Sequence, residues 1–180
     1  CHGLHERGAY TFYMCPGGYV VNASSEPERT CVNGMSYSCR NAANANSAII
    51  VSVTKDDFGG EDALAGMRYQ RMLEHKNYML GNGKIPQQLF GDYCQNVESS
   101  AYGAYASETK GQTVFSNLRG LMSNEMEQSF MQGMAHFAKI VTGFDRADAI
   151  LSGMETRTSS PVRILRNEHC ESMITGIYPC

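Results

Sequence analysis

The apolar and polar positions in the first third of the chain predict β structure over residues 9–54. Residues 9–14 are rich in Tyr, Thr and Phe, which favour strands. A Pro-Gly-Gly turn follows at 16–18, and residues 19–23 resume the extended pattern. The pattern therefore predicts two strands joined by a tight turn.

Two further strands are expected in this region. Residues 29–32 are followed by Asn-Gly at 33–34, a pair typical of hairpin turns. Residues 47–54 form a near-continuous apolar run. Such a run predicts a strand that is buried on both faces.

Two long helices are predicted in the middle of the chain, where the apolar period becomes helical. The first spans residues 62–80, with Gly81 as the glycine that follows a helix. The second has Ser123 as its N-cap and ends at Gly143. A short helix is expected over 86–93. The apolar positions of the first helix fall on one face and are Ala65, Tyr69, Met72, Leu73 and Leu80. Those of the second helix form a stripe of Met126, Phe130, Met134, Phe137 and Val141, whose Met and Phe residues are expected to pack in the core.

Extended patterns return near the end of the chain, over residues 148–154, 162–165 and 173–178. The order of strands, helices and strands predicts an α+β domain. We expect the N- and C-terminal strands to share a mixed or antiparallel sheet, with the two long helices between them in the sequence.

The chain has 180 residues, and its 42% apolar and 18% charged residues are typical of one globular domain. This domain is expected to be β-rich over 1–54 and 148–180 and helical over 60–143. A net charge of −3 disfavours a nucleic-acid-binding module, which carries a basic surface. No apolar run approaches the length of a membrane-spanning helix, so no membrane contact is expected. Because the chain starts at Cys1 without an initiator Met and ends in an apolar segment, we expect a piece of a longer protein.

Seven cysteines are distributed at irregular spacings, and none forms a Cys-x-x-Cys pair. This pattern disfavours a zinc site and a thioredoxin-like redox pair, and we predict no metal site. Reduced thiols in a cytoplasmic protein are expected, most of them buried as small apolar groups. The cysteines are Cys1, Cys15, Cys31, Cys39, Cys94, Cys170 and Cys180.

The first candidate for a functional cluster combines a thiol with a glycine turn. Cys15 precedes Pro16, and Gly17 and Gly18 follow. Two glycines let a backbone approach a ligand closely, because they lack Cβ and permit positive φ. The alternative is a tight turn beside a buried thiol, which the spacing alone favours.

A second candidate cluster is rich in asparagine and leads into the strand predicted over 47–54. Its members are Asn33, Asn41, Asn44 and Asn46. An Asn side chain both donates and accepts hydrogen bonds, so it can bind a planar heterocycle. Asparagines also cap turns, which is the commoner case.

A third cluster, residues 155–163, contains one carboxylate, two guanidinium groups and four hydroxyl groups. In an extended segment, Glu155, Arg157 and Ser159 point to one face and form a row that can bind an anion. We expect Arg157 to contact the anion, Glu155 to orient Arg157, and Thr158 and Ser159 to act as supporting donors. A solvated hairpin loop is the alternative.

Several of these blocks occur together and in the same order in a known family. Residues 7–18, 33–36, 44–48, 155–164 and 176–179 resemble successive blocks of the uncharacterised bacterial FAD-dependent dehydrogenases. The resemblance extends over essentially the whole chain.

The resemblance implies a flavoprotein whose Rossmann-type FAD domain is formed by the rest of a longer chain. This chain is then the inserted, substrate-side domain, which caps the flavin and contacts a small-molecule substrate. Tyr13 stands where the family commonly has Cys, which disfavours a redox-active cysteine pair. We expect the chain alone to be inactive and to bind FAD weakly or not at all, because no phosphate-binding glycine loop is recognisable.

The clusters and the resemblance together give a predicted site with two parts. The residues predicted to be catalytic are Cys15, Glu155 and Arg157. The residues predicted to bind the cofactor are Gly17, Gly18, Asn33, Thr158, Ser159 and Arg163. Two other functions remain open: a non-catalytic binding or interaction module, and a thiol enzyme that uses Cys15.

Overall fold

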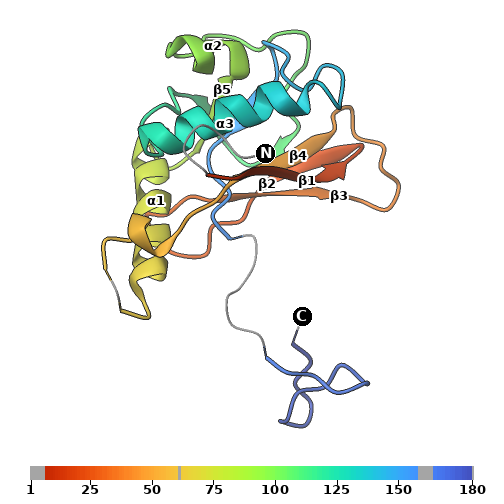
Figure 1. Cartoon of the computed structure of the whole chain (residues 1–180). Coiled ribbons are helices and arrows are strands. Elements are labelled where there is room, and N and C mark those ends of the chain that lie inside the picture. Colours follow the sequence, from red (N-terminus) through yellow and green to blue (C-terminus); the bar gives the residue numbers. More distant parts are fainter. Residues whose placement is uncertain (1–6, 61, 158–163, 180) are drawn as a thin grey trace.

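The computed structural model describes residues 7–60, 62–157 and 164–179, and it shows an α+β domain (Figure 1). Within these residues the strands form three small sheets, and two of the helices are long. The α+β class and the two long helices are therefore confirmed. None of the helices in the described ranges is long and apolar enough to cross a membrane.

The first sheet consists of β1 (Ala9–Cys15) and β4 (Asn46–Val51), which pair antiparallel. Both strands lie close to the predicted ranges. β4 is half-buried at every position, so the prediction that both of its faces are buried is wrong. The reason is that β4 has one strand as its neighbour and lines an open cavity.

The second sheet has the order β3-β2-β6 and contains β2 (Gly18–Asn22), β3 (Val32–Ser36) and β6 (Thr109–Lys110). The predicted turn at 33–34 is wrong, because Asn33 and Gly34 lie inside β3 and pair with Val21 and Val20. A glycine fits this strand because Asn46 approaches Gly34 closely, where any larger side chain would collide.

The third sheet is built around β5 (Ile85–Leu89), which pairs parallel with β7 (Thr113–Phe115) and antiparallel with β8 (Ile150–Ser152). The sequence predicts a helix over 86–93, but a strand occupies the first part of this range. A short helix, α2 (Phe90–Gln95), follows it. The strand is hard to recognise because its two buried glutamines give it a polar character.

The long helices are α1 (Ala65–Gly81) and α3 (Asn124–Phe137). Ser123 caps α3 as predicted, since its Oγ accepts a hydrogen bond from the backbone N–H of Met126 at 3.3 Å. α3 ends earlier than the predicted Gly143. The core cluster joins α2, α3 and the loop between β7 and α3, and consists of Phe90, Tyr93, Leu118, Leu121, Phe130 and Met134.

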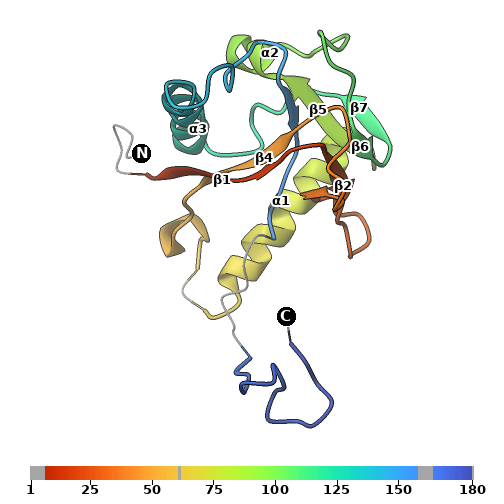
Figure 2. The same ribbon diagram turned by 90° about the vertical axis from the view of Figure 1, so that its right-hand side faces the viewer.

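The end of the chain differs from the prediction. Residues 173–178 form no strand, and Met173 is 94% exposed, so the strand expected there is wrong. Residues 164–179 lie apart from the sheets and helices in both overall views (Figures 1 and 2). β1 pairs with β4 and β8 pairs with β5, so the N- and C-terminal strands do not share one sheet. An apolar segment forms a strand only where a neighbouring backbone offers hydrogen bonds.

Candidate functional site

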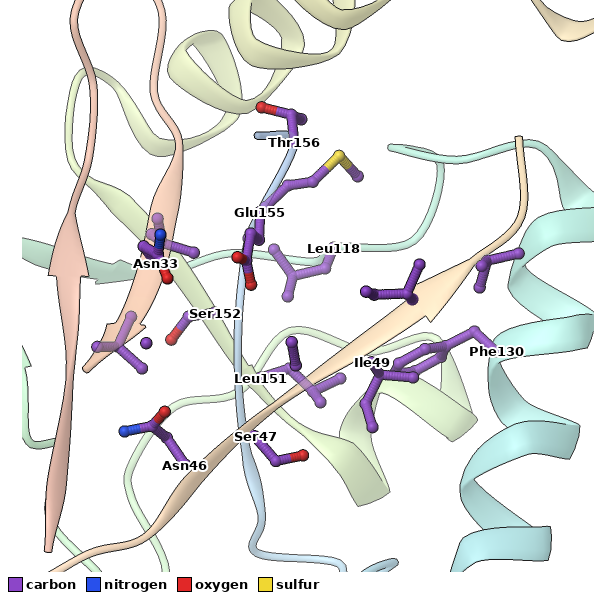
Figure 3. Close-up of a pocket in the computed structure, with 18 of the residues that line it drawn as sticks. Asn33, Asn46, Ser47, Ile49, Leu118, Phe130, Leu151, Ser152, Glu155 and Thr156 are labelled. Atoms are coloured by element: carbon purple, nitrogen blue, oxygen red, sulfur yellow. The ribbon is translucent and has the colours of Figure 1, made fainter. Parts of the chain in front are cut away.

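A cavity of about 1740 Å³ opens between β3, β4, β8, α1 and α3 (Figure 3). It exceeds the roughly 300–1,000 Å³ of a typical small-molecule pocket, so it can hold more than one ring-sized molecule. One wall is apolar and comes mainly from β4, β8, α3 and the loop before α3. Its residues include Ile49, Leu118, Met122, Phe130, Met134 and Leu151.

Polar side chains line another part of the same cavity. Asn33 comes from β3, Asn46 from the start of β4 and Ser152 from the end of β8, and Glu155 follows β8 (Figure 3). The Nδ2 group of Asn46 donates to the backbone carbonyls of Tyr19 at 3.2 Å and Met35 at 3.4 Å. Its Oδ1 accepts no hydrogen bond from the described residues. The cavity therefore presents amide, hydroxyl and carboxyl groups opposite an apolar surface.

Glu155 is the carboxyl group of this polar wall. Its side chain points into the cavity (Figure 3), and no hydrogen bond or ion pair connects it to another part of the described chain. Burial raises the pKa of Glu155 above its ordinary value, because the charged form loses hydration without gaining a partner. A carboxyl group of this kind can hold a proton closer to neutral pH than an exposed glutamate can.

Arg157, two residues further along, has a different environment. Its Nε donates to Oε1 of Glu74 at 2.7 Å, and its Nη2 donates to Oε2 at the same distance. Oε1 of Glu74 also accepts a hydrogen bond from the Thr156 hydroxyl at 2.6 Å. The prediction that Glu155 orients Arg157 is therefore wrong, because a buried glutamate of α1 holds the guanidinium instead.

In the Glu74–Arg157 pair, burial and charge shift the pKa of Glu74 in opposite directions. Glu74 is a buried side chain, and burial alone would raise its pKa. The hydrogen bonds from Arg157 and Thr156, together with the charge of Arg157, reverse this effect and lower the pKa of Glu74. The same pairing raises the pKa of Arg157. Arg157 is thus a charged group that already forms two hydrogen bonds with Glu74.

The glycine turn lies at the edge of this site. Gly18 lines the cavity, whereas Gly17 and Cys15 are outside its lining. Gly17 has a φ of +55°, and a Cβ there would collide with the backbone carbonyl of Arg40. A Cβ on Gly18 would lie 2.6 Å from the Met35 carbonyl oxygen. The close approach that these glycines permit is therefore made by the protein's own backbone.

The cysteines near this turn are free thiols in the structure. Cys15 is half-buried, Cys31 is buried and Cys39 is exposed. No basic side chain bonds to Cys15 in the described part of the chain. The predicted cofactor-binding residues Thr158, Ser159 and Arg163 lie outside the described residues. Among the residues that are described, no group of His, Cys, Asp and Glu could hold a metal ion.

The sequence analysis missed a buried hydrogen-bond cluster on the cavity wall. Gln87, from β5, is fully buried and lies within hydrogen-bond distance of Ser107, Thr109 and Ser152. These four residues all line the cavity. The only local signal is the pair of glutamines in an otherwise apolar strand, since buried amides require partners.

The cavity lining can be compared with the flavin ring of FAD, the cofactor that the sequence resemblance implies. An isoalloxazine ring has a polar edge with carbonyl groups and an apolar edge, and the cavity has a polar wall facing an apolar one. Asn33, Asn46 and Ser152 could hold the polar edge. The glycine turn does not offer a place for the pyrophosphate, because Arg40 and Met35 already occupy the space beside it.

Comparisons with known proteins identify a family and a relative. Residues 1–158 match the family described as FAD-dependent protein, C-terminal domain-like. An uncharacterised protein of Clostridium beijerinckii is 42% identical over 177 residues, which cover 97% of this chain and 33% of that protein. The chain thus spans about a third of the length of this relative.

Proposed function

Because the chain belongs to the FAD-dependent protein C-terminal domain-like family, we propose that it is the substrate-side domain of an FAD-dependent oxidoreductase. In this proposal the rest of a longer chain holds FAD, and the cavity covers the flavin ring and a small-molecule substrate. The size of the cavity supports this, since one ring alone does not fill it. When bound, the flavin supplies the hydride transfer.

The proposal depends mainly on the environment of Glu155. Glu155 is a carboxyl group in a cavity with an apolar wall, it has no partner in the described chain, and its pKa is raised by burial. Its role is to hold or deliver a proton at its carboxyl oxygens while the substrate is oxidised or reduced. Asn33 and Asn46 orient the substrate or the polar edge of the ring, and the apolar wall excludes water.

Arg157 is a positioning residue in this proposal. Its two hydrogen bonds to Glu74 fix the end of the segment that carries Glu155. Gly18 and Asn33, which also line the cavity, face the flavin ring. The roles of Cys15 and Gly17 remain predictions from the sequence, as do those of Thr158, Ser159 and Arg163.

A tryptophan inserted into the cavity tests the location of the flavin. The chain contains no Trp, and an indole in contact with a flavin quenches its fluorescence. Met122 lines the cavity, whereas Met79, on α1, is 64% exposed and lies outside the cavity lining. We expect Met122→Trp to quench the fluorescence of bound FAD in the full-length protein. The matched control Met79→Trp should leave it unchanged.

The outcomes of this test separate the alternatives. Equal fluorescence in both variants, with FAD bound in full, would overturn the proposal and favour a binding module that lies away from the flavin. A second measurement addresses Glu155 itself. In the full-length protein, Glu155→Gln should remove one titration step from the pH dependence of the flavin absorbance, and exposed Glu28→Gln should retain it. An unchanged titration in Glu155→Gln would remove Glu155 from the site.

A further inference from the structure

The buried amide of Gln87 organises three hydroxyl groups on the cavity wall. Its Nε2 lies 3.0 Å from Ser107 Oγ, 2.9 Å from Thr109 Oγ1 and 2.9 Å from Ser152 Oγ. Its Oε1 accepts a hydrogen bond from the Tyr102 hydroxyl at 2.6 Å. The amide thus connects β5, β6, β8 and the loop before β6 at one point.

These distances fix the orientation of the amide. Hydrogen bonds between two oxygens are typically about 2.5–3.0 Å long, and those from nitrogen to oxygen about 2.7–3.2 Å. The 2.6 Å contact with Tyr102 suits an O–H donor and an oxygen acceptor, and the contacts of 2.9–3.0 Å suit N–H donors. The Nε2 group has two hydrogens for three hydroxyl oxygens, so one N–H is shared between two of them, and no hydroxyl donates to this nitrogen.

Counting hydrogens shows which donors remain free. Each hydroxyl group has one hydrogen to donate. Ser107 and Thr109 lie 2.8 Å apart, so one of them donates to the other. The second hydroxyl of this pair and the hydroxyl of Ser152 have no further acceptor in the described chain. Two hydroxyl hydrogens are consequently available on a wall that lines the cavity.

The charges around this cluster select the kind of acceptor. Arg146, which lies over the ring of Tyr105, is already bound to Asp148 through two hydrogen bonds of 2.8 and 2.9 Å. Glu108, which lies between Ser107 and Thr109 in the chain, also lines the cavity, and its carboxylate disfavours a second anion. An uncharged acceptor, such as a carbonyl oxygen, therefore suits the cluster better than a carboxylate or a phosphate.

We infer that Ser152 and the Ser107–Thr109 pair form a binding subsite for a carbonyl oxygen carried on an uncharged, mainly apolar ring. The apolar wall with Ile49, Leu118 and Leu151 would contact the body of the ring (Figure 3). This inference rests on the proposed function, because it specifies what the cavity binds. Two sources share the chemistry: a carbonyl of the flavin ring itself, or a ketone or quinone substrate.

Matched ring compounds can test the subsite in the full-length protein loaded with FAD. Menadione is a naphthalene ring with two carbonyl groups, and 2-methylnaphthalene is the same ring without them. Dissociation constants from equilibrium dialysis are compared for the wild type, Ser152→Ala and Thr109→Val. Ser129→Ala, a buried serine outside the cavity lining, is the control.

For a substrate carbonyl, we expect Ser152→Ala and Thr109→Val to weaken menadione binding about five-fold, the effect of losing one neutral hydrogen bond. Binding of 2-methylnaphthalene and the Ser129→Ala control should not change. If the flavin carbonyl occupies the subsite, menadione binding stays the same, and the two variants instead weaken FAD binding and shift the flavin absorbance maximum. No change in either ligand, with normal thermal unfolding, overturns the inference. If the Met122→Trp quenching persists in that case, the proposed function stands without this subsite.

Discussion

Glu74 contacts the segment of residues 155–157 and Glu155 belongs to it, yet the two glutamates have opposite environments. Glu74 is buried and has two hydrogen bonds from Arg157 and one from Thr156, which lower its pKa. Glu155 faces the cavity without a partner, and burial raises its pKa. The same type of side chain is therefore shifted towards its charged form in one place and towards its protonated form in the other.

This contrast distinguishes a structural role from a chemical one. A carboxylate whose oxygens are occupied cannot bind a ligand, and its removal leaves a buried charge on its partner unbalanced. A carboxyl group without a partner reduces stability when it ionises, and such a cost is typical of functional sites. The comparison supports a structural role for Glu74 and Arg157, and it leaves Glu155 as the candidate for a chemical role.

The largest effect is expected from breaking the ion pair. Arg157→Ala leaves the Glu74 carboxylate buried with Thr156 as its remaining side-chain donor. The free energy of unfolding should fall by about 2–4 kcal/mol, somewhat below the range for fully buried pairs because Arg157 is 35% exposed. Urea unfolding of the chain measures this loss. Arg157→Lys should recover only part of it, since lysine cannot form both hydrogen bonds. A loss below 0.5 kcal/mol, the range of ordinary surface substitutions, would contradict the structural role.

The next largest effect is expected in the stability of the chain at acidic pH. The pKa of Glu74 in the folded chain lies below its ordinary value of 4.5. Its stabilising contribution is therefore complete above this value and is lost as the pH falls through the folded pKa. The wild type should lose stability more steeply than Glu74→Gln between about pH 5 and about pH 3. Parallel pH curves for the two proteins would show that Arg157 does not hold this carboxylate.

Glu155 should give a smaller effect of the opposite sign. Its folded pKa lies above the ordinary 4.5, so its contribution is complete below that value and is lost as the pH rises through the folded pKa. Glu155→Gln should equal the wild type in stability at about pH 4 and exceed it slightly at about pH 7. Thermal unfolding at the two pH values measures the difference. A less stable variant at about pH 7 would indicate that Glu155 has a partner in solution.

The smallest effect concerns thiol labelling beside the ion pair. Cys31 is 1% exposed, and burial, followed by the charge of Glu74, raises its pKa. Alkylation by iodoacetamide needs an accessible thiolate, so Cys31 should react slowly in the wild type. Arg157→Ala removes a charge that lowers the pKa of Cys31, but the greater access of reagent to the opened region should outweigh this and speed the reaction. Exposed Cys39 and Cys94 serve as internal controls and should react equally in both proteins. Peptide masses report each site, and an unchanged Cys31 rate would indicate that the region stays closed without the pair.

The sequence predicted those features that depend on local pattern. The helical period and the Ser123 cap located both ends of α1 and the start of α3 to within a few residues. The β-favouring residues on either side of the Pro-Gly-Gly turn located β1 and β2. These features depend on neighbouring residues, whose side chains alone decide propensity and capping.

The remaining features depend on contacts between distant residues. β5 was missed because Gln87 and Gln88 find their partners up to 65 residues away, and no local rule reports such partners. The orienting residue of Arg157 was misassigned to Glu155 because Glu74 is 83 residues earlier in the chain. The clusters containing Asn33 and Glu155 were found, since dense polar residues near strands are visible in the sequence, and the structure places both residues at the cavity.

The Glu74–Arg157 pair also limits how related sequences can diverge. A change at one position alone leaves either a buried carboxylate or a guanidinium without its partner, and selection for a folded protein removes such intermediates. The two positions should therefore covary across the family, either kept as Glu and Arg or replaced together by an uncharged pair. Positions 155 and 157 are closer in sequence, but they should vary independently of each other. The pattern of substitutions among relatives would then record, without any experiment on this chain, which of the two glutamates supports the fold.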